Sequence, residues 1–338
     1  MRAWLLDDPR GPTGYRLGEI AAPALGAGEV RVELRASALN HLDLWVAYGM
    51  PRPPSFPHIP GADGAGVVVE TGEAVNEVTT GAEVVIDPAT SCGRCDACLR
   101  GDIPFCDSFG VVGEHRWGTH AASVVVPAVN VAPKPKRLGW SEAAAFGLVT
   151  SSAIRMMRRG RLVAGERALV IGVGGGSATA AFLVAAARGA KVYVTSTSAD
   201  KRAWAREHGA AGAFETKAAY DEEVRAATGG LGVDLAIDNV GTATFERTIA
   251  SLAKGGRLVT NGSSSGRTFE LHLPSLFWRQ LEVIGASMND HREFAEALEL
   301  VEAGLDVPVE ESVPFEGFPE ALARLEAGDQ LGKLVLAR

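Results

Sequence analysis

Short apolar runs, each bounded by glycine or proline, fill the part of the chain before residue 141. Val30–Arg35 alternates apolar and polar residues, as a strand with one buried face does. Three further short runs are bounded by turn residues, at Gly64–Glu70, Glu83–Asp87 and Ala122–Pro127. The polar, proline-rich segment Pro133–Arg137 then forms a stiff connection. This pattern predicts a first domain made of short β-strands.

From about Ser141 the pattern changes to apolar runs separated by helical stretches. An alanine-rich helical stretch comes first, and the predicted strands are Arg167–Gly172, Lys191–Thr195, Val233–Asp238 and Gly256–Thr260. Helices are predicted directly after the first of these strands, at Asp200–His208 and at Phe245–Leu252. Strands that alternate with helices at this interval predict a parallel, doubly wound α/β sheet. From about Met288 an amphipathic helix, Arg292–Gly304, and a last strand at Lys333–Leu336 end the chain.

Length and composition narrow the class of protein. A chain of 338 residues is long enough for two domains. Its 46% hydrophobic and 22% charged residues are typical of a soluble globular protein. The net charge of −8 argues against nucleic-acid binding through phosphate neutralisation. The expected partner is therefore a small-molecule substrate.

Two segments of the chain bear on the cellular compartment in which the protein is expected. The start of the chain, from Met1 to Asp8, lacks the apolar core of a signal peptide. The uncharged stretch Ala168–Ala187 has the length of a membrane span, but four glycines fall in its first half. A buried strand, a glycine turn and a helix explain this stretch better, so a cytoplasmic protein with no membrane contact is expected.

All four cysteines fall in one segment with the spacing C-x2-C-x2-C-x7-C: Cys92, Cys95, Cys98 and Cys106. Four thiolates brought together by tight turns make a closed tetrahedral zinc site, with no position left for water or substrate. A disulfide cluster or free thiols are the alternatives, but disulfides suit small secreted scaffolds rather than a chain of this length. The spacing predicts one structural Zn²⁺ per chain.

A glycine-rich turn between a predicted strand and a predicted helix indicates a dinucleotide site. The turn contains Gly172, Gly174, Gly175 and Gly176, and Ser177 replaces the third glycine of the fingerprint. Glycines at these positions let the backbone approach a pyrophosphate at the helix N-terminus. The alternative is a glycine-rich turn without a ligand.

The end of the next strand favours NADPH over NADH. An acidic residue there would bind the adenosine ribose, but the chain has the hydroxyl residues Thr195–Ser198. Ser196 and Ser198 leave room for a 2′-phosphate, and Lys201 or Arg202 can neutralise it. Asp200 is expected to cap the following helix. In the alternative interpretation, Lys201 and Arg202 form only a solvated helix face.

These motifs, with Gly61–Val68, Asp238–Gly241 and Gly332–Leu336, resemble the medium-chain dehydrogenase/reductase family over nearly the whole chain. The resemblance implies a GroES-like β-barrel catalytic domain and a Rossmann domain. The catalytic domain would comprise residues 1–147, with a zinc lobe at about 91–108, and residues 287–338. The Rossmann NADP-binding domain would comprise residues 148–286.

Within this family, alcohol dehydrogenases hold a catalytic zinc with two cysteines and a histidine. The corresponding positions here are Asn40, Ala62 and about Phe146, and no cysteine exists outside the lobe. The hydroxyl that relays the alcohol proton would fall at Leu42. The resemblance therefore implies that the chain keeps the structural zinc and lacks the catalytic one.

The N-x-x-D pattern of Asn40 and Asp43 is similar to the zinc-independent quinone oxidoreductase branch, whose members reduce quinones or activated C=C bonds with NADPH. Many members of that branch lack the cysteine lobe, and many have tyrosine where this chain has Trp45. The resemblance implies a homodimer or homotetramer. It places four catalytic residues in the cleft: Asn40, His41, Asp43 and Tyr48. It also places Thr150, Val240, Asn261 and Gly262 around the nicotinamide.

Roles outside catalysis remain open for these residues. Asn40 and Asp43 can serve only to cap a turn, His41 can bind the pyrophosphate, and Tyr48 can be a packing residue. Two other functions also remain open. One is a metal-dependent alcohol dehydrogenase with the unusual ligands His41, Asp43 and Asp63, and the other is a non-catalytic NADPH-binding protein.

Overall fold

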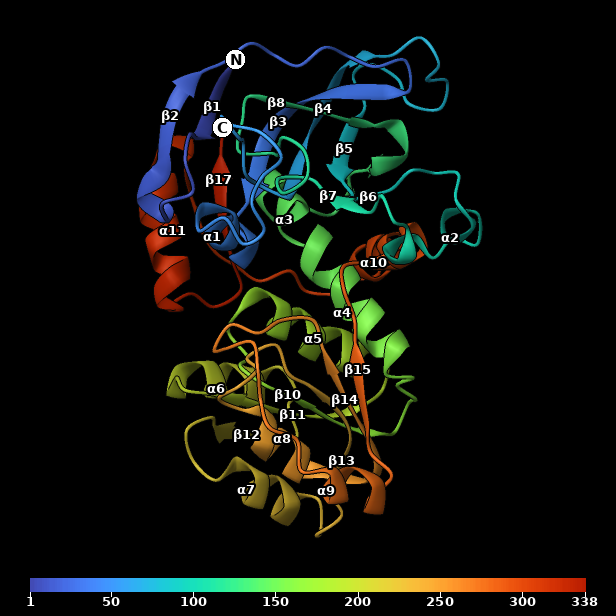
Figure 1. Cartoon of the computed structure of the whole chain (residues 1–338), viewed down its shortest axis with the longest axis vertical. Coiled ribbons are helices and arrows are strands. Elements are labelled where there is room, and N and C mark those ends of the chain that lie inside the picture. Colours follow the sequence, from blue (N-terminus) through green and yellow to red (C-terminus); the bar gives the residue numbers. More distant parts are fainter. The chain divides into compact units, whose positions relative to one another are not determined.

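A computed structural model describes residues 1–338 and divides them into two compact units. Unit 1 consists of Met1–Leu148 and Asn289–Arg338, and unit 2 consists of Val149–Met288 (Figure 1). The predicted boundaries followed residues 147 and 286, so each differs by one or two positions from the division in the structure.

Unit 1 is built around a seven-stranded sheet in the order β16-β17-β3-β4-β5-β9, with β8 pairing to β3. Its strands are β1 (Arg2–Leu6), β2 (Tyr15–Glu19), β3 (Glu29–Ala38), β4 (Asp63–Thr71), β5 (Glu83–Ile86), β6 (Ala89–Thr90), β7 (Gly110–Val111), β8 (Ser123–Pro127), β9 (Val131–Pro133), β16 (Val309–Pro314) and β17 (Lys333–Ala337). Its helices are α1 (His41–Ala47), α2 (Asp96–Leu99), α3 (Trp140–Ala145), α10 (His291–Glu302) and α11 (Phe318–Ala327).

Strand β3 shows why the alternating pattern predicts correctly. Val30, Val32 and Leu34 are buried in one apolar cluster, while the residues between them are half-buried or exposed. At its end, Ala38 lies opposite Val335 of β17 on one side and Asp63 of β4 on the other. The pairing thus brings residues from distant parts of the chain together at the carboxyl end of β3.

Unit 2 is a six-stranded parallel sheet in the order β12-β11-β10-β13-β14-β15. Its strands are β10 (Arg167–Val170), β11 (Lys191–Ser196), β12 (Gly212–Glu215), β13 (Val233–Ile237), β14 (Leu252–Thr260) and β15 (Glu282–Gly285). Its helices are α4 (Gly147–Arg159, which begins in unit 1), α5 (Gly176–Ala187), α6 (Ala199–Glu207), α7 (Tyr220–Ala227), α8 (Phe245–Ser251) and α9 (Leu273–Trp278). The GroES-like and Rossmann-like α/β architecture predicted from the sequence is confirmed.

The uncharged stretch Ala168–Ala187 folds into β10, the glycine turn and α5, as predicted. No helix in the structure has both the length and the apolar character needed to cross a membrane. One capping prediction was wrong. Ser198, not Asp200, is the N-cap of α6, because the Ser198 side chain accepts a hydrogen bond from the Lys201 N–H and Asp200 already lies in the first turn.

Candidate active site

The residues predicted to bind the dinucleotide gather at the carboxyl edge of the unit 2 sheet. Parallel strands end at the same edge, so the segments that follow β10, β11, β13 and β14 meet there. The strand order reverses between β10 and β13, because the chain runs outward from β10 to β12 and then returns. Such a reversal opens the crevice in which doubly wound sheets bind nucleotides.

The glycine turn has the conformation that a pyrophosphate cradle needs. Gly174 has φ +114°, and a Cβ atom there would lie 2.2 Å from the Lys201 Cδ atom. Gly175 is the N-cap of α5 and offers no side chain to the first N–H groups of that helix. These donors, at the positive end of a 12-residue helix, fit an anionic cofactor.

The adenosine end of this crevice carries hydroxyl and basic side chains. Arg202 donates hydrogen bonds to the Ser196 carbonyl at 2.6 Å and to Glu215 at 2.6 Å, so β11, α6 and β12 are joined there. The Lys201 stem crosses Gly174 instead. The structure therefore places the Lys201 stem at the glycine turn, and it pairs the Arg202 guanidinium with Glu215.

The residues predicted around the nicotinamide lie in two loops and one helix. Val240 follows β13, and a Cβ atom at Gly172 would lie 3.5 Å from its Cγ2 atom. Asn261 and Gly262 follow β14, and the Asn261 N–H donates to the Asn239 side chain at 3.4 Å. Thr150 is buried in the first turn of α4.

In unit 1, Asn40 lies in a buried polar cluster with Asp63 and Lys333, which are 6%, 1% and 5% exposed. The Asn40 Nδ2 atom donates to Asp63 at 2.9 Å and, more weakly, to the Ala38 carbonyl at 3.4 Å. The Lys333 ammonium donates to Asn40 Oδ1 at 2.5 Å and to Asp63 Oδ2 at 3.1 Å. The other Asp63 oxygen accepts the N–H of Leu148, in the first turn of α4, at 2.7 Å.

Asp43 joins three segments of unit 1. Its two carboxylate oxygens accept the N–H groups of Asn40 at 2.7 Å and of Gly61 at 2.9 Å. The His120 Nε2 atom lies 3.5 Å from Asp43, and its Nδ1 atom lies 2.9 Å from the Ser37 hydroxyl. Asp43 is therefore a buried capping residue of α1, which agrees with the alternative role that the sequence indicated for it. The Asn40 side chain points instead to Lys333 and Asp63.

His41 and Tyr48, at the two ends of α1, are both exposed. Desolvation by neighbouring protein lowers the pKa of His41, although the charges of Asp43 and Glu326 act in the opposite direction. The Tyr48 hydroxyl donates to Glu326 of α11 at 2.9 Å, and this hydrogen bond raises the pKa of Tyr48. A neutral imidazole and a neutral phenol are hydrogen-bond donors at physiological pH.

The residues at the expected catalytic metal position do not fit a metal. Ala62 and Phe146 are both fully buried and apolar, and Phe146 stacks on Phe294 with 6.2 Å between ring centroids. All four carboxylate oxygens of Asp43 and Asp63 already accept hydrogen bonds within the protein. His41, Asp43 and Asp63 do not form a convergent group, since the four cysteines are the only such cluster of three or more His, Cys, Asp or Glu ligand atoms.

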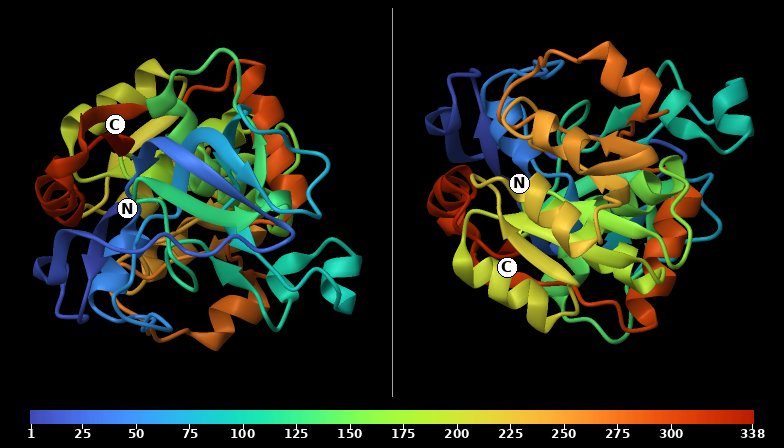
Figure 2. Two further views of the ribbon diagram at one scale, coloured as in Figure 1. Left: turned by 90° about the horizontal axis from the view of Figure 1, so that it is seen from above. Right: turned by 90° about the horizontal axis from the view of Figure 1, so that it is seen from below.

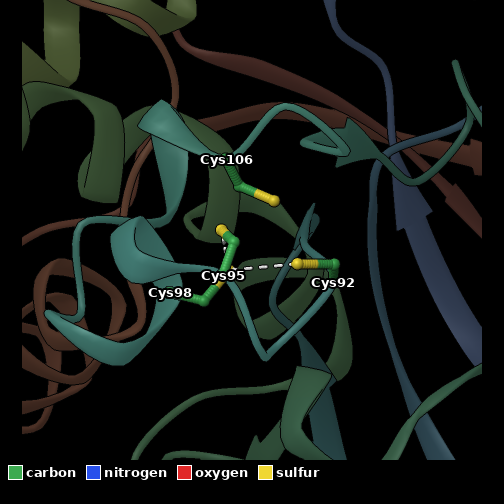
Figure 3. Close-up of side chains that lie close together, drawn as sticks. All are labelled: Cys92, Cys95, Cys98 and Cys106. Atoms are coloured by element: carbon green, nitrogen blue, oxygen red, sulfur yellow. Dashed lines mark hydrogen bonds between the residues drawn. The ribbon is translucent and has the colours of Figure 1, made fainter.

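The four cysteines do fit a metal (Figure 3). They lie around α2 in a lobe that projects from the rest of unit 1 (Figure 2). Their sulfur atoms all lie within 4.8 Å of one another, with Cys92 and Cys98 3.8 Å apart. Tetrahedral Zn²⁺ with bonds of about 2.3 Å places sulfur atoms about 3.8 Å apart. A hydrogen bond from Ser91 lowers the pKa of Cys98 to about 6, which favours the thiolate.

Lys333 and Glu326 are site residues that sequence reasoning missed. The motif Gly332–Leu336 was noted only as a part of the family resemblance, and its lysine has no local signal for burial. Lys333 contacts Asn40 across 293 positions of sequence, and Glu326 contacts Tyr48 across 278 positions, so no local pattern connects them.

Comparisons with known proteins agree with this architecture. Residues 26–136 match the family model described as alcohol dehydrogenase GroES-like domain, and residues 176–303 match the one described as zinc-binding dehydrogenase. The chain is 31% identical to an NAD-dependent alcohol dehydrogenase of Sulfolobus acidocaldarius, with 99% of each chain covered. It is 28% identical to an acryloyl-coenzyme A reductase of Metallosphaera sedula, with 96% of each chain covered. A solved structure of an NAD-dependent alcohol dehydrogenase matches with a TM-score of 0.96, 39% identity and 100% coverage of both chains.

Proposed function

Because the chain belongs to the zinc-type medium-chain dehydrogenase/reductase superfamily, and is therefore an oxidoreductase, we propose that it reduces activated acceptors with NADPH and without a catalytic metal. The acceptor is an α,β-unsaturated carbonyl compound or a quinone. The observation that carries the proposal is the cluster of Asn40, Asp63 and Lys333, which takes the place of a metal-ligand set.

Conjugated acceptors suit a site without a Lewis acid. When bound, NADPH supplies the hydride. As a conjugated acceptor is reduced, its negative charge spreads onto the carbonyl oxygen, where hydrogen-bond donors stabilise it. Asn40, His41 and Tyr48 are the candidate donors of unit 1. In the reduction of a saturated ketone, or the reverse oxidation of an alcohol, the negative charge develops on the oxygen of the reacting carbon–oxygen bond. A metal ion normally polarises that bond.

Enoyl thioesters are the acceptors to try first. An acryloyl-coenzyme A reductase is among the relatives, and it aligns over 96% of this chain. A thioester conjugated to a C=C bond has the same delocalised oxygen as an enone. Quinones are the second class, because the N-x-x-D pattern of Asn40 and Asp43 resembles quinone oxidoreductases.

The residues of unit 2 fit NADP(H). The glycine turn and the N-terminus of α5 would hold the pyrophosphate, while Ser196, Ser198 and Lys201 would hold the 2′-phosphate. The four cysteines would hold one structural Zn²⁺, which would fix the fold of the lobe and take no part in the reaction, since four protein ligands complete its coordination.

The experiment follows NADPH oxidation with matched acceptors. A conjugated enone or enoyl thioester is compared with its saturated counterpart, and a quinone is measured beside them. Turnover on the conjugated compounds alone supports the proposal. Turnover on the saturated ketone would contradict it, because it requires a carbonyl-polarising centre. Tight NADPH binding without turnover on any acceptor would favour the non-catalytic alternative.

We also propose that two copies pair through unit 2. β15 is an edge strand of the parallel sheet, and its Val283 is 41% exposed. The preceding helix α9 buries none of its residues and exposes Leu273, Phe277 and Trp278 by 61%, 55% and 76%. An unpaired edge beside exposed aromatic side chains favours pairing with a second copy, because monomers usually protect such an edge.

A further inference from the structure

Lys333 is a buried cation that contacts the candidate hydrogen-bond donor Asn40. Its side chain is 5% exposed, and its ammonium group donates to Asn40 Oδ1 at 2.5 Å and to Asp63 Oδ2 at 3.1 Å. A buried ammonium requires an opposite charge close by. Asp63 supplies that charge, so the cluster is neutral as a whole.

The chemistry of these partners fixes the orientation of the Asn40 carboxamide. An ammonium group can only donate, so the Asn40 atom that faces Lys333 must be the oxygen. An ionised carboxylate can only accept, so the Asn40 atom that faces Asp63 must be the nitrogen. The flipped amide would set N–H against ammonium and oxygen against carboxylate. Lys333 and Asp63 together therefore allow one amide orientation.

This orientation leaves one hydrogen of Asn40 weakly held. One Nδ2 hydrogen is engaged by Asp63 at 2.9 Å, and the other has only the Ala38 carbonyl at 3.4 Å, a long contact. The ammonium at Oδ1 polarises the amide, and a hydrogen bond at one end of such a chain strengthens donation at the other. The second hydrogen is the one available to an acceptor oxygen.

The fold explains why these three residues meet. Ala38 of β3 pairs with Val335 of β17 on one side and with Asp63 of β4 on the other. Asn40 comes two residues after Ala38, and Lys333 two residues before Val335. Sheet pairing thus fixes the backbone of Asp63 and Lys333, and Asn40 is held between the end of β3 and the start of α1, where it is the N-cap.

We propose that Lys333 is a positioning residue for the reaction: it holds and polarises the Asn40 carboxamide so that one N–H group faces the substrate oxygen. The oriented N–H group would then stabilise charge on that oxygen, as a catalytic metal ion does in proteins that have the metal ligands. This inference rests on the proposed function, because it assigns to Asn40 the hydrogen bond that stabilises the conjugated acceptor.

The test compares Lys333→Met with the double variant Asp63→Asn/Lys333→Met. The single variant leaves the Asp63 charge buried and is at risk of misfolding, whereas the double variant removes both charges and keeps an oxygen for the Leu148 N–H. Lys136→Met, at an exposed lysine of the same unit, is the matched control. Lys333→Arg tests whether another cationic donor restores activity.

We expect kcat for the conjugated acceptor to fall about 10- to 100-fold in the double variant, by analogy with the range for residues that orient the ligands of metal sites, with little change in KM. Lys333→Arg should recover part of kcat, and Lys136→Met should match the unaltered protein. A folded double variant with unchanged kcat would overturn the inference, and so would a loss confined to KM.

A second readout separates this inference from the proposed function. With asparagine labelled by ¹⁵N, the side-chain signal that Asn40→Ala removes is assigned to Asn40. In the unaltered protein its two amide hydrogens should differ strongly in chemical shift, and the double variant should lose that difference. If the unaltered protein reduces no conjugated acceptor, the proposed function fails while this signal still reports the fixed amide. If the signal is the same in both proteins, the role of Lys333 is wrong.

Discussion

Replacing Lys201 by alanine tests which residue selects NADPH. The Lys201 side chain crosses Gly174 in the glycine turn, so it lies at the predicted cofactor crevice, and we expect it to contact the 2′-phosphate. A hydrogen bond to a charged group contributes about 1.5–3 kcal/mol. Lys201 is half-buried, and solvent screening reduces this figure to about 1–2 kcal/mol. The Kd for NADPH should therefore rise about 5- to 30-fold in Lys201→Ala.

The assay is a fluorescence titration of NADPH and of NADH at one fixed ionic strength. The Kd for NADH, which has no 2′-phosphate, should stay nearly constant. Lys254→Ala is the control, because Lys254 is exposed and lies near the amino end of β14, away from the carboxyl edge. If Lys201→Ala weakens both cofactors equally, Lys201 acts on the glycine turn that it crosses and not on the phosphate. If neither Kd changes, the assignment is wrong.

Three further predictions concern the metal, the assembly and the response to acid. Metal analysis should find one zinc per chain, and Cys98→Ser should abolish it and lower Tm because the lobe loses its cross-link. Trp278→Glu should convert a dimer to a 35.3 kDa monomer in light scattering, since it places a charge on the exposed apolar surface. Burial opposes ionisation of Asp234, but hydrogen bonds from Arg167 lower its pKa below the usual value of 3.8. The Arg167–Asp234 pair therefore stabilises the fold above pH 3.8, and this contribution is lost as the pH falls through the pKa of Asp234 in the folded protein. Asp234→Asn should flatten the acid limb of a Tm–pH profile. An unchanged acid limb would show that the pair does not cause the loss of stability in acid.

Much of the fold follows from local pattern. The alternation of Val30–Arg35 predicts β3 because a strand with one buried face repeats every two residues. Among the elements that sequence reasoning did not predict, β12 and β15 are short and carry weak patterns, whereas the amphipathic helix α7 carries a pattern that was overlooked. Gly212–Glu215 has four residues, and β15 is a largely exposed edge strand without the apolar run of the inner strands.

The candidate site divides in the same way. The sequence alone is enough to identify the cysteine spacing, the glycine turn and the replacement of metal ligands by Asn40 and Ala62, because each is a feature of neighbouring residues. The partner of a polar side chain cannot be read this way. Lys201 or Arg202 was expected at the 2′-phosphate, and the structure adds a partner for Arg202 that the sequence does not indicate, Glu215, because β12 lies beside β11.

The sequence by itself determined the family, the two-domain order, the cysteine cluster and the absence of the usual catalytic metal ligands, because each of these depends on residue types at short spacings. Only the tertiary structure decided what replaces those ligands. Lys333 is 293 residues from Asn40 and 270 from Asp63, and the three meet because β17 and β4 flank the end of β3. Strand pairing sets such distant neighbours, and a local pattern of apolar and polar residues does not encode which strands become adjacent.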